Sequence, residues 1–197
     1  MLRYSNKQKL KSMSTLKIHT IESAPEGSKP LLEKSIKAYG MIPGLHGVLA
    51  GAPGILEAYQ TLHELFVNSS FTNEEKTVVW QTINVEHQCH YCVPAHTGIA
   101  AMMNVDPAIT DALRNGTKMP SEKLQALHEM TLSIVRNRGR VSDAELELFY
   151  AAGYTERQLL EIILGLSQKI ISNYSNHIAN TPVDAPFKKF AWEPATN

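Results

Sequence analysis

The chain has 197 residues, 43% of them hydrophobic, and its 19 basic residues balance 19 acidic ones to a formal net charge of zero. A chain of this length can bury a full core as one domain without disulfide or metal cross-links. Zero net charge provides no excess positive charge for nucleic acid or an anionic membrane. No apolar run reaches the roughly 20 residues that span a bilayer, so we expect a cytoplasmic protein with neither kind of partner.

The first 20 residues are expected to form a flexible N-terminal extension. Residues 1–17 contain basic side chains and no acidic one. A transit peptide shares this composition, but the segment has one arginine and little amphipathic patterning. Met13 is a second candidate start, which would make the residues before it an unstructured upstream extension.

Apolar residues recur at three- and four-residue intervals along the rest of the chain, a period typical of helices. The expected helices cover residues 31–39, 52–68, 72–86, about 89–103, 106–115, 121–135, 142–152 and 155–171. No segment alternates with period two as a strand does, so we predict an all-α fold of about eight helices. The helical domain is expected over 21–185, followed by an irregular tail over 186–197.

Several helix ends carry their own signals. Thr72 with Glu75 three residues later forms a capping-box pattern, and Ser142 and Thr155 are further candidate N-caps. Gly116 and Gly153 stand where helices are expected to stop.

Both cysteines lie in one short motif. Cys89 and Cys92 are separated by two residues, with Glu86 before them and His96 after them. At about 100° per residue these four positions fall within about 120° of one helix face. Pro94 has no N–H to donate and is best tolerated in the first turn of a helix, so the cysteines are expected at a helix N-terminus.

This arrangement favours thiol chemistry. A cysteine attacks as a thiolate, which a helix N-terminus stabilises and a nearby base such as His96 can help to form. Glu86 is predicted to orient His96, completing a carboxylate–imidazole–thiol relay. A thiolate that attacks a peroxide becomes a sulfenic acid, and a second thiol condenses with it to a disulfide and water. Cys92 and Cys89 supply both groups.

Other interpretations of the motif remain open. His90 and His96 could complete a zinc site with the cysteines, although ligands so close along one helix do not easily surround a tetrahedral ion. The cysteines could also be buried and inert. A third alternative is a non-catalytic helical oligomer whose cysteine pair acts as a redox sensor or interaction switch. A thioredoxin-like fold needs a βαβ unit, which this pattern lacks.

The motif resembles the signature of the AhpD-like proteins, the alkylhydroperoxidase members of the carboxymuconolactone decarboxylase superfamily. The matching pattern is Glu86-x-x-Cys89-x-Tyr91-Cys92-x-x-Ala95-His96. Segments 39–43, 52–53 and 173–184 extend the resemblance over most of the chain. The decarboxylase branch of the superfamily does not rely on a CxxC pair, so the intact pair favours the redox branch.

The resemblance implies an all-α homo-oligomer that reduces hydroperoxides without metal, flavin or other cofactor. By position, Cys92 matches the peroxidatic cysteine, Cys89 the resolving cysteine and His96 the relay histidine. It also implies an external dithiol reductant, which in some relatives is a lipoylated carrier.

The sequence departs from the family pattern at two points. Thr77 stands where the best-characterised relatives have their relay glutamate, so Glu86 is predicted to replace it. Tyr91 stands where they have a histidine, and His90 lies one residue earlier. His177 is expected either to line the pocket or a subunit interface, or to cap the end of its helix. His46, His63 and His128 are expected at the surface or the edge of the core.

Overall fold

The computed structural model describes residues 16–194. Over that range the chain forms nine α-helices and two short 3-10 helices, and it contains no strand. This confirms the all-α prediction. The α-helices are α1 Lys29–Tyr39, α2 Gly44–Leu49, α3 Pro53–Val67, α4 Asn73–Glu86, α5 Cys92–Met102, α6 Pro107–Asn115, α7 Glu122–Arg136, α8 Asp143–Ala151 and α9 Glu156–Ala179. The predictions for residues 1–15, including the alternative start at Met13, lie outside the described range.

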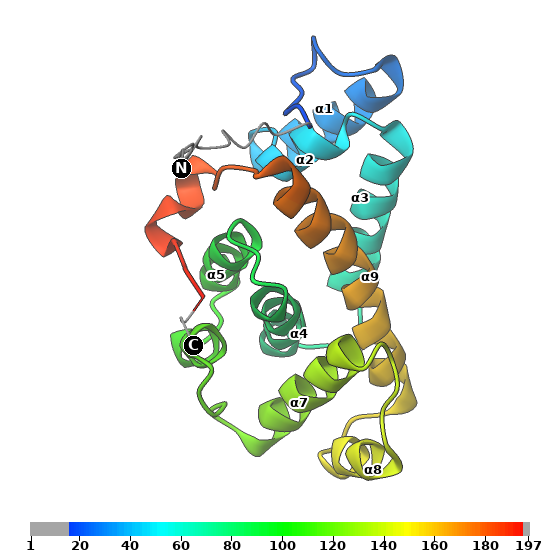
Figure 1. Cartoon of the computed structure of the whole chain (residues 1–197), viewed down its shortest axis with the longest axis vertical. Coiled ribbons are helices and arrows are strands. Elements are labelled where there is room, and N and C mark those ends of the chain that lie inside the picture. The colour runs from blue at the N-terminus through cyan, green and yellow to red at the C-terminus, as the bar shows by residue number, and fades with distance from the viewer. Residues whose placement is uncertain (1–15, 195–197) are drawn as a thin grey trace, which may run out of the picture.

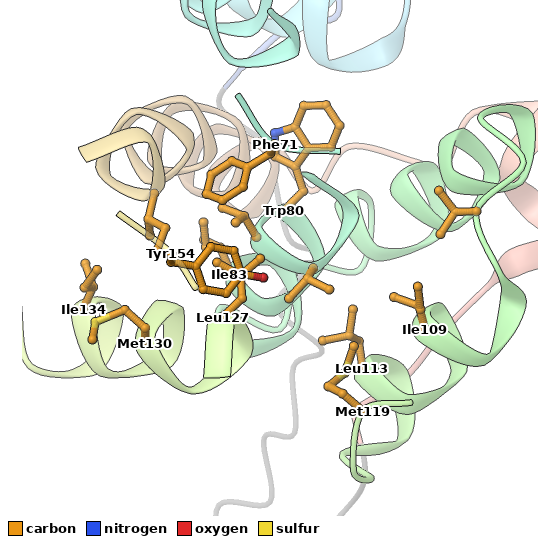
Figure 2. Close-up of a cluster of buried hydrophobic side chains, with 14 of the residues drawn as sticks. Phe71, Trp80, Ile83, Ile109, Leu113, Met119, Leu127, Met130, Ile134 and Tyr154 are labelled. Carbon is orange, nitrogen blue, oxygen red and sulfur yellow. The ribbon is translucent and has the colours of Figure 1, made fainter. Parts of the chain in front are cut away.

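Helix α4 lies inside the molecule and packs against α5, α6, α7 and α9 (Figure 1). The longest helix, α9, has 24 residues and packs against both α3 and α4. One apolar cluster surrounds α4 and includes the fully buried Trp80, Ile83 and Leu127, with Phe71 and Tyr154 beside them (Figure 2). Because these four helices cover α4, side chains on almost every side of it are buried.

A second buried cluster joins α2, α3 and α5. It contains Leu45 and Leu49 of α2, Tyr59 of α3, and both cysteines. The cysteine pair is therefore part of a packed interior, with Cys89 and Cys92 only 0% and 2% exposed.

The helix ends follow the sequence signals closely. Thr72 and Ser142 form complete capping boxes with Glu75 and Glu145, and α6 ends at Gly116 in the left-handed conformation. Helix α2 was not predicted. It has only six residues, two of them glycines, and is too short to show a periodic pattern.

The tail is more regular than expected. Residues 182–194 include a 3-10 helix, η2 Ala185–Phe190, which packs against α5. A Cβ added to Gly98 of α5 would lie 2.4 Å from the ring of Phe187, so the two segments meet at a glycine. Arg114 donates hydrogen bonds to the carbonyl oxygens of Phe190 and Ala191. The prediction of an irregular tail is wrong for this segment, because its aromatic side chains have a surface to pack on.

Candidate active site at the cysteine pair

A tight turn between α4 and α5 positions the two cysteines. Helix α4 ends at Glu86, and Gln88 adopts a left-handed conformation with φ of 52°. The Cys89 N–H then donates to the Asn84 carbonyl, and α5 begins at Cys92 with Pro94 in its first turn. The predicted placement of the pair at a helix N-terminus is therefore confirmed.

The two thiols are in direct contact. The Sγ atoms of Cys89 and Cys92 lie 2.7 Å apart, and both residues are free cysteines. The Cys92 backbone N–H donates to Cys89 Sγ at 3.2 Å, and Asn176 Nδ2 donates to Cys92 Sγ at 3.3 Å. Cys92 is therefore the sulfur that receives side-chain donors, as a thiolate requires.

His96 lies one turn after Cys92 and faces a lysine. Its Nε2 is 2.7 Å from Nζ of Lys169, which is 1% exposed. An ammonium group has donors and no acceptor, so Nε2 accepts from it and the neutral ring carries its proton on Nδ1. Within the described residues Nδ1 has no hydrogen-bond partner, although it is buried. The geometry thus leaves one free imidazole donor in the site.

Glu86 does not contact His96, and this part of the predicted relay is wrong. Both Glu86 oxygens accept from Arg136, at 2.9 Å from Nε and 2.8 Å from Nη2. Glu86 lies in the last turn of α4, where its long side chain reaches the partly exposed edge of α7. Thr77, at the position of the relay glutamate in the characterised relatives, donates its hydroxyl to the Asn73 carbonyl of its own helix.

Lys169 belongs to a buried polar face on the C-terminal half of α9 that the sequence analysis missed. The other members are 0% exposed: Gln168, Ser172, Asn173 and Asn176. A signal for this face exists in the sequence. The apolar series Leu159, Ile162 and Leu166 continues at helical spacing into Lys169, Asn173 and Asn176.

A chain of buried amides fixes this face against α4 and α5. Asn173 donates to Asn84, and Asn84 donates to Gln81. Gln81 then donates to the Val93 carbonyl and the Thr97 hydroxyl of α5. Satisfied networks of this kind hold side chains in one arrangement, so the helix that carries the cysteines is fixed in register.

Tyr91 and the adjacent histidine are tied to the C-terminal segment. The Tyr91 hydroxyl donates to Asp184 at 2.6 Å, and Asp184 also accepts from the Gly44 N–H at the start of α2. The His90 ring contacts the Thr181 carbonyl and stacks on His177, which is exposed at the end of α9. His177 therefore lies beside the motif, on its solvent side.

The two thiols have opposite pKa shifts. Burial raises the pKa of the Cys92 thiol, but the Cys89 donor, the positive charge of Lys169 and the Asn176 amide outweigh burial and lower it to about 6. The hydrogen bond to Cys92, together with burial, raises the pKa of Cys89. Burial and the Lys169 charge lower the pKa of His96, so its imidazole is neutral. Burial also lowers the pKa of Lys169, while both cysteines oppose that shift.

Two further features of the described residues bear on the site. No group of three or more His, Cys, Asp or Glu side chains within residues 16–194 is arranged to hold a metal ion. In the same range, no helix combines the length and hydropathy needed to cross a bilayer.

No family model and no curated protein matches the sequence. Solved structures do match the fold. The AhpD-core peroxidase-related protein from Ralstonia eutropha JMP134 superposes with a TM-score of 0.75 at 18% identity, covering 86% of this chain and 92% of that one. For the peroxidase-related protein from Silicibacter sp. TM1040 the TM-score is 0.74 at 15% identity, over 93% and 97%.

The debrominase Bmp8, solved in complex with 2,3,4-tribromopyrrole, gives a TM-score of 0.73 at 14% identity, covering 89% of this chain and 94% of that one. Proteins of this fold therefore include some described as peroxidase-related and one described as a debrominase. All three similarities span most of both chains. The chain has the AhpD-like all-α fold.

Proposed function

We propose that the protein is a thiol-dependent peroxidase that reduces hydroperoxides through a cycle between the Cys89/Cys92 dithiol and its disulfide. The observation that carries this proposal is the contact of two free, buried thiols of which only Cys92 has a lowered pKa. A thiolate at Cys92 attacks the outer peroxide oxygen, the O–O bond breaks, and Cys92 becomes a sulfenic acid while the alkoxide leaves.

The second step uses the neighbouring thiol. Cys89, whose raised pKa keeps its proton, attacks the Cys92 sulfenic acid. A disulfide forms, and the sulfenic hydroxyl leaves as water with the Cys89 proton. An external dithiol then reduces the disulfide and is itself oxidised. Two electrons thus pass from that dithiol to one hydroperoxide, giving an alcohol and water.

His96 and Lys169 take the roles first predicted for His96 and Glu86. The His96 Nδ1–H donor, left unpartnered by the Nε2–Lys169 contact, hydrogen-bonds to the departing alkoxide, which takes its proton from solvent. Lys169 also contributes the buried positive charge that favours the Cys92 thiolate. We therefore assign Cys92, Cys89 and His96 to the chemistry and Lys169 to positioning His96 and stabilising the thiolate.

The reductant and the location follow from the same chemistry. The described residues hold no third cysteine, so electrons must come from a partner dithiol, for which we propose a lipoylated carrier. We propose a cytoplasmic location, because a reducing compartment keeps such a pair available as thiols.

We also propose that the chain forms a homo-oligomer through the outer face of α9. Five exposed apolar side chains lie within an arc of about 80° at 100° per residue, opposite the buried polar face. These residues form the outer stripe: Leu160, Ile163, Ile170, Tyr174 and Ile178. Between them only the uncharged Ser167 shares the arc, so a second copy offers a matching apolar surface. Light scattering should give a mass that falls when Ile163 and Ile170 are both replaced by Glu, but not for Leu148→Glu on exposed α8.

The peroxidase proposal is tested by following the loss of tert-butyl hydroperoxide with dihydrolipoamide as reductant. The wild-type protein should turn over, and Cys92→Ser should abolish turnover. Cys89→Ser should stop after one event and leave a sulfenic acid on Cys92 that dimedone traps. A disulfide that forms reversibly without turnover would instead support the alternative of a redox sensor or interaction switch.

A further inference from the structure

A cavity of about 220 Å³ opens between α1 and α3, next to the cysteine site. Its wall includes the rings of Tyr39, His46, Tyr59 and His63. These rings contact one another in series: Tyr39 meets His46 edge-on, His46 meets Tyr59 edge-on, and Tyr59 stacks on His63. The cavity is therefore lined largely by flat side chains, which suit a flat ligand.

Two wall residues connect the cavity to the reacting groups. Tyr59 belongs to the same buried cluster as Cys89 and Cys92, and after burial the charge on Cys92 is the next cause that raises the Tyr59 pKa. His63 stacks on Trp80. The Trp80 ring in turn contacts the His96 ring, with 4.9 Å between their centroids. Tyr59 thus lies between the cavity and the thiols, and His63 and Trp80 lie between the cavity and His96.

The hydrogen bonds of this layer run through Gln168. Its Nε2 contacts His63 Nδ1 at 3.0 Å and the Tyr59 hydroxyl at 3.4 Å, while its Oε1 accepts from Trp80. Because Gln168 lies beside Lys169 on α9, one helical turn carries both the amide bound to Tyr59 and His63 and the lysine that positions His96.

The cavity wall carries no net charge. Burial lowers the pKa of both His46 and His63 to about 4, so both imidazoles are neutral near pH 7. The charged wall residues Lys34 and Glu64 are exposed and pair with each other at 3.5 Å. An anionic ligand would find no unpaired cation here, and a neutral ligand loses less hydration free energy than an anion on leaving water.

We propose that this cavity binds the organic part of the substrate, and that the preferred class is neutral hydroperoxides with a single aromatic ring. The inference rests on the proposed peroxidase function. The ring occupies the cavity beside the His46, Tyr59 and His63 rings, and the Tyr59 side chain turns aside to let the hydroperoxide group reach Cys92. Hydroperoxides that carry a carboxylate are disfavoured, since the wall offers them no counter-charge.

The turnover test uses Ala38→Trp, which places an indole at the wall of the cavity on α1. Ala144→Trp, at an exposed position of α8, is the matched control. The quantity compared is kcat/KM for cumene hydroperoxide divided by kcat/KM for hydrogen peroxide. We expect Ala38→Trp to lower this ratio at least tenfold and Ala144→Trp to leave it as in the wild type. An equal ratio in all three proteins overturns the proposal.

A binding test separates this proposal from the peroxidase proposal. Saturation-transfer NMR on the full-length protein uses 2-phenyl-2-propanol, the alcohol product of cumene hydroperoxide, as a probe that needs no reaction. We expect transfer with the wild-type protein and with Ala144→Trp, and its loss with Ala38→Trp. If the wild type binds the probe at this site but reduces no peroxide, the function is wrong and the aromatic site stands. If Ala38→Trp binds the probe as the wild type does, the site is wrong whatever the activity.

Discussion

The two halves of α9 bury opposite kinds of side chain. In the N-terminal half, Ile162 is fully buried in the apolar cluster, and Gly165 allows the Phe66 ring to approach closely. In the C-terminal half the inward positions are Lys169, Asn173 and Asn176. Apolar burial stabilises the fold, whereas burying an amine and amides costs free energy unless partners compensate. The first half therefore holds the fold together, and the second serves the cysteines.

The largest expected effect is a loss of folding stability on mutating the N-terminal half of α9. Ile162→Ala removes buried methyl groups from the apolar half and should lower the free energy of unfolding by about 3 kcal/mol. Urea denaturation measures this loss. Peroxide turnover per folded molecule should remain near the wild-type value, because Ile162 lies two turns from Lys169. A stable variant with lost activity would show that the halves are not separate.

Lys169→Met tests the polar half. The lowered pKa means that Cys92 is a thiolate above about pH 6, so kcat/KM in the wild type should rise with pH through about 6. Without the lysine charge the midpoint should move toward the ordinary thiol value of about 8.5, which lowers the rate at pH 7 roughly 30-fold and restores it near pH 9.

The thiolate absorbance at 240 nm should follow the same shift. Stability at pH 7 should change little, because Cys92 then keeps its proton and no unpaired charge is left buried. Lys37→Met, at an exposed position of α1, is the control and should keep the wild-type profile. If the midpoint stayed near 6 in Lys169→Met, Lys169 would not be the group that lowers the Cys92 pKa.

Lowering the pH should destabilise the protein through the buried histidines of the cavity wall. His46 and His63 have folded-state pKa values of about 4, below the usual 6.5. As the pH falls, the unfolded chain therefore takes up protons on these histidines before the folded protein does. The stability that the neutral histidines contribute is complete above pH 6.5 and falls as the pH drops toward 4. At pH 5 the free energy of unfolding is lower by about 2 kcal/mol for each histidine. Urea midpoints between pH 8 and 5 measure the fall, and His63→Gln should make it shallower.

The smallest effect is expected outside both halves, at Glu86. Its pair with Arg136 is partly exposed, and such pairs contribute at most about 1 kcal/mol. Glu86→Gln should therefore change turnover by less than about fivefold, since each 1.4 kcal/mol corresponds to tenfold. A loss of a hundredfold in kcat would return Glu86 to the relay first predicted for it.

The sequence predicts this fold well because its signals are local. The Thr72 and Ser142 capping boxes and the stop at Gly116 concern residues within one helical turn, and the cysteine motif places its own members on one face. The partner of His96 is different. It comes from position 169, and spacing along the chain offered only the nearby Glu86. Lys169 could have been suspected from its place in an apolar series, but which residue it meets depends on how α9 crosses α5.

The packing of η2 on α5 has a practical consequence for handling the protein. Gly98 and Arg114 receive a C-terminal segment that also carries Asp184, the residue holding Tyr91 and the start of α2. Truncation ahead of residue 184 would uncover the cysteine helix and release two elements around the thiols at once. An affinity tag is therefore better attached at the N-terminus, and a C-terminally shortened variant that lost activity would reveal a disturbed scaffold.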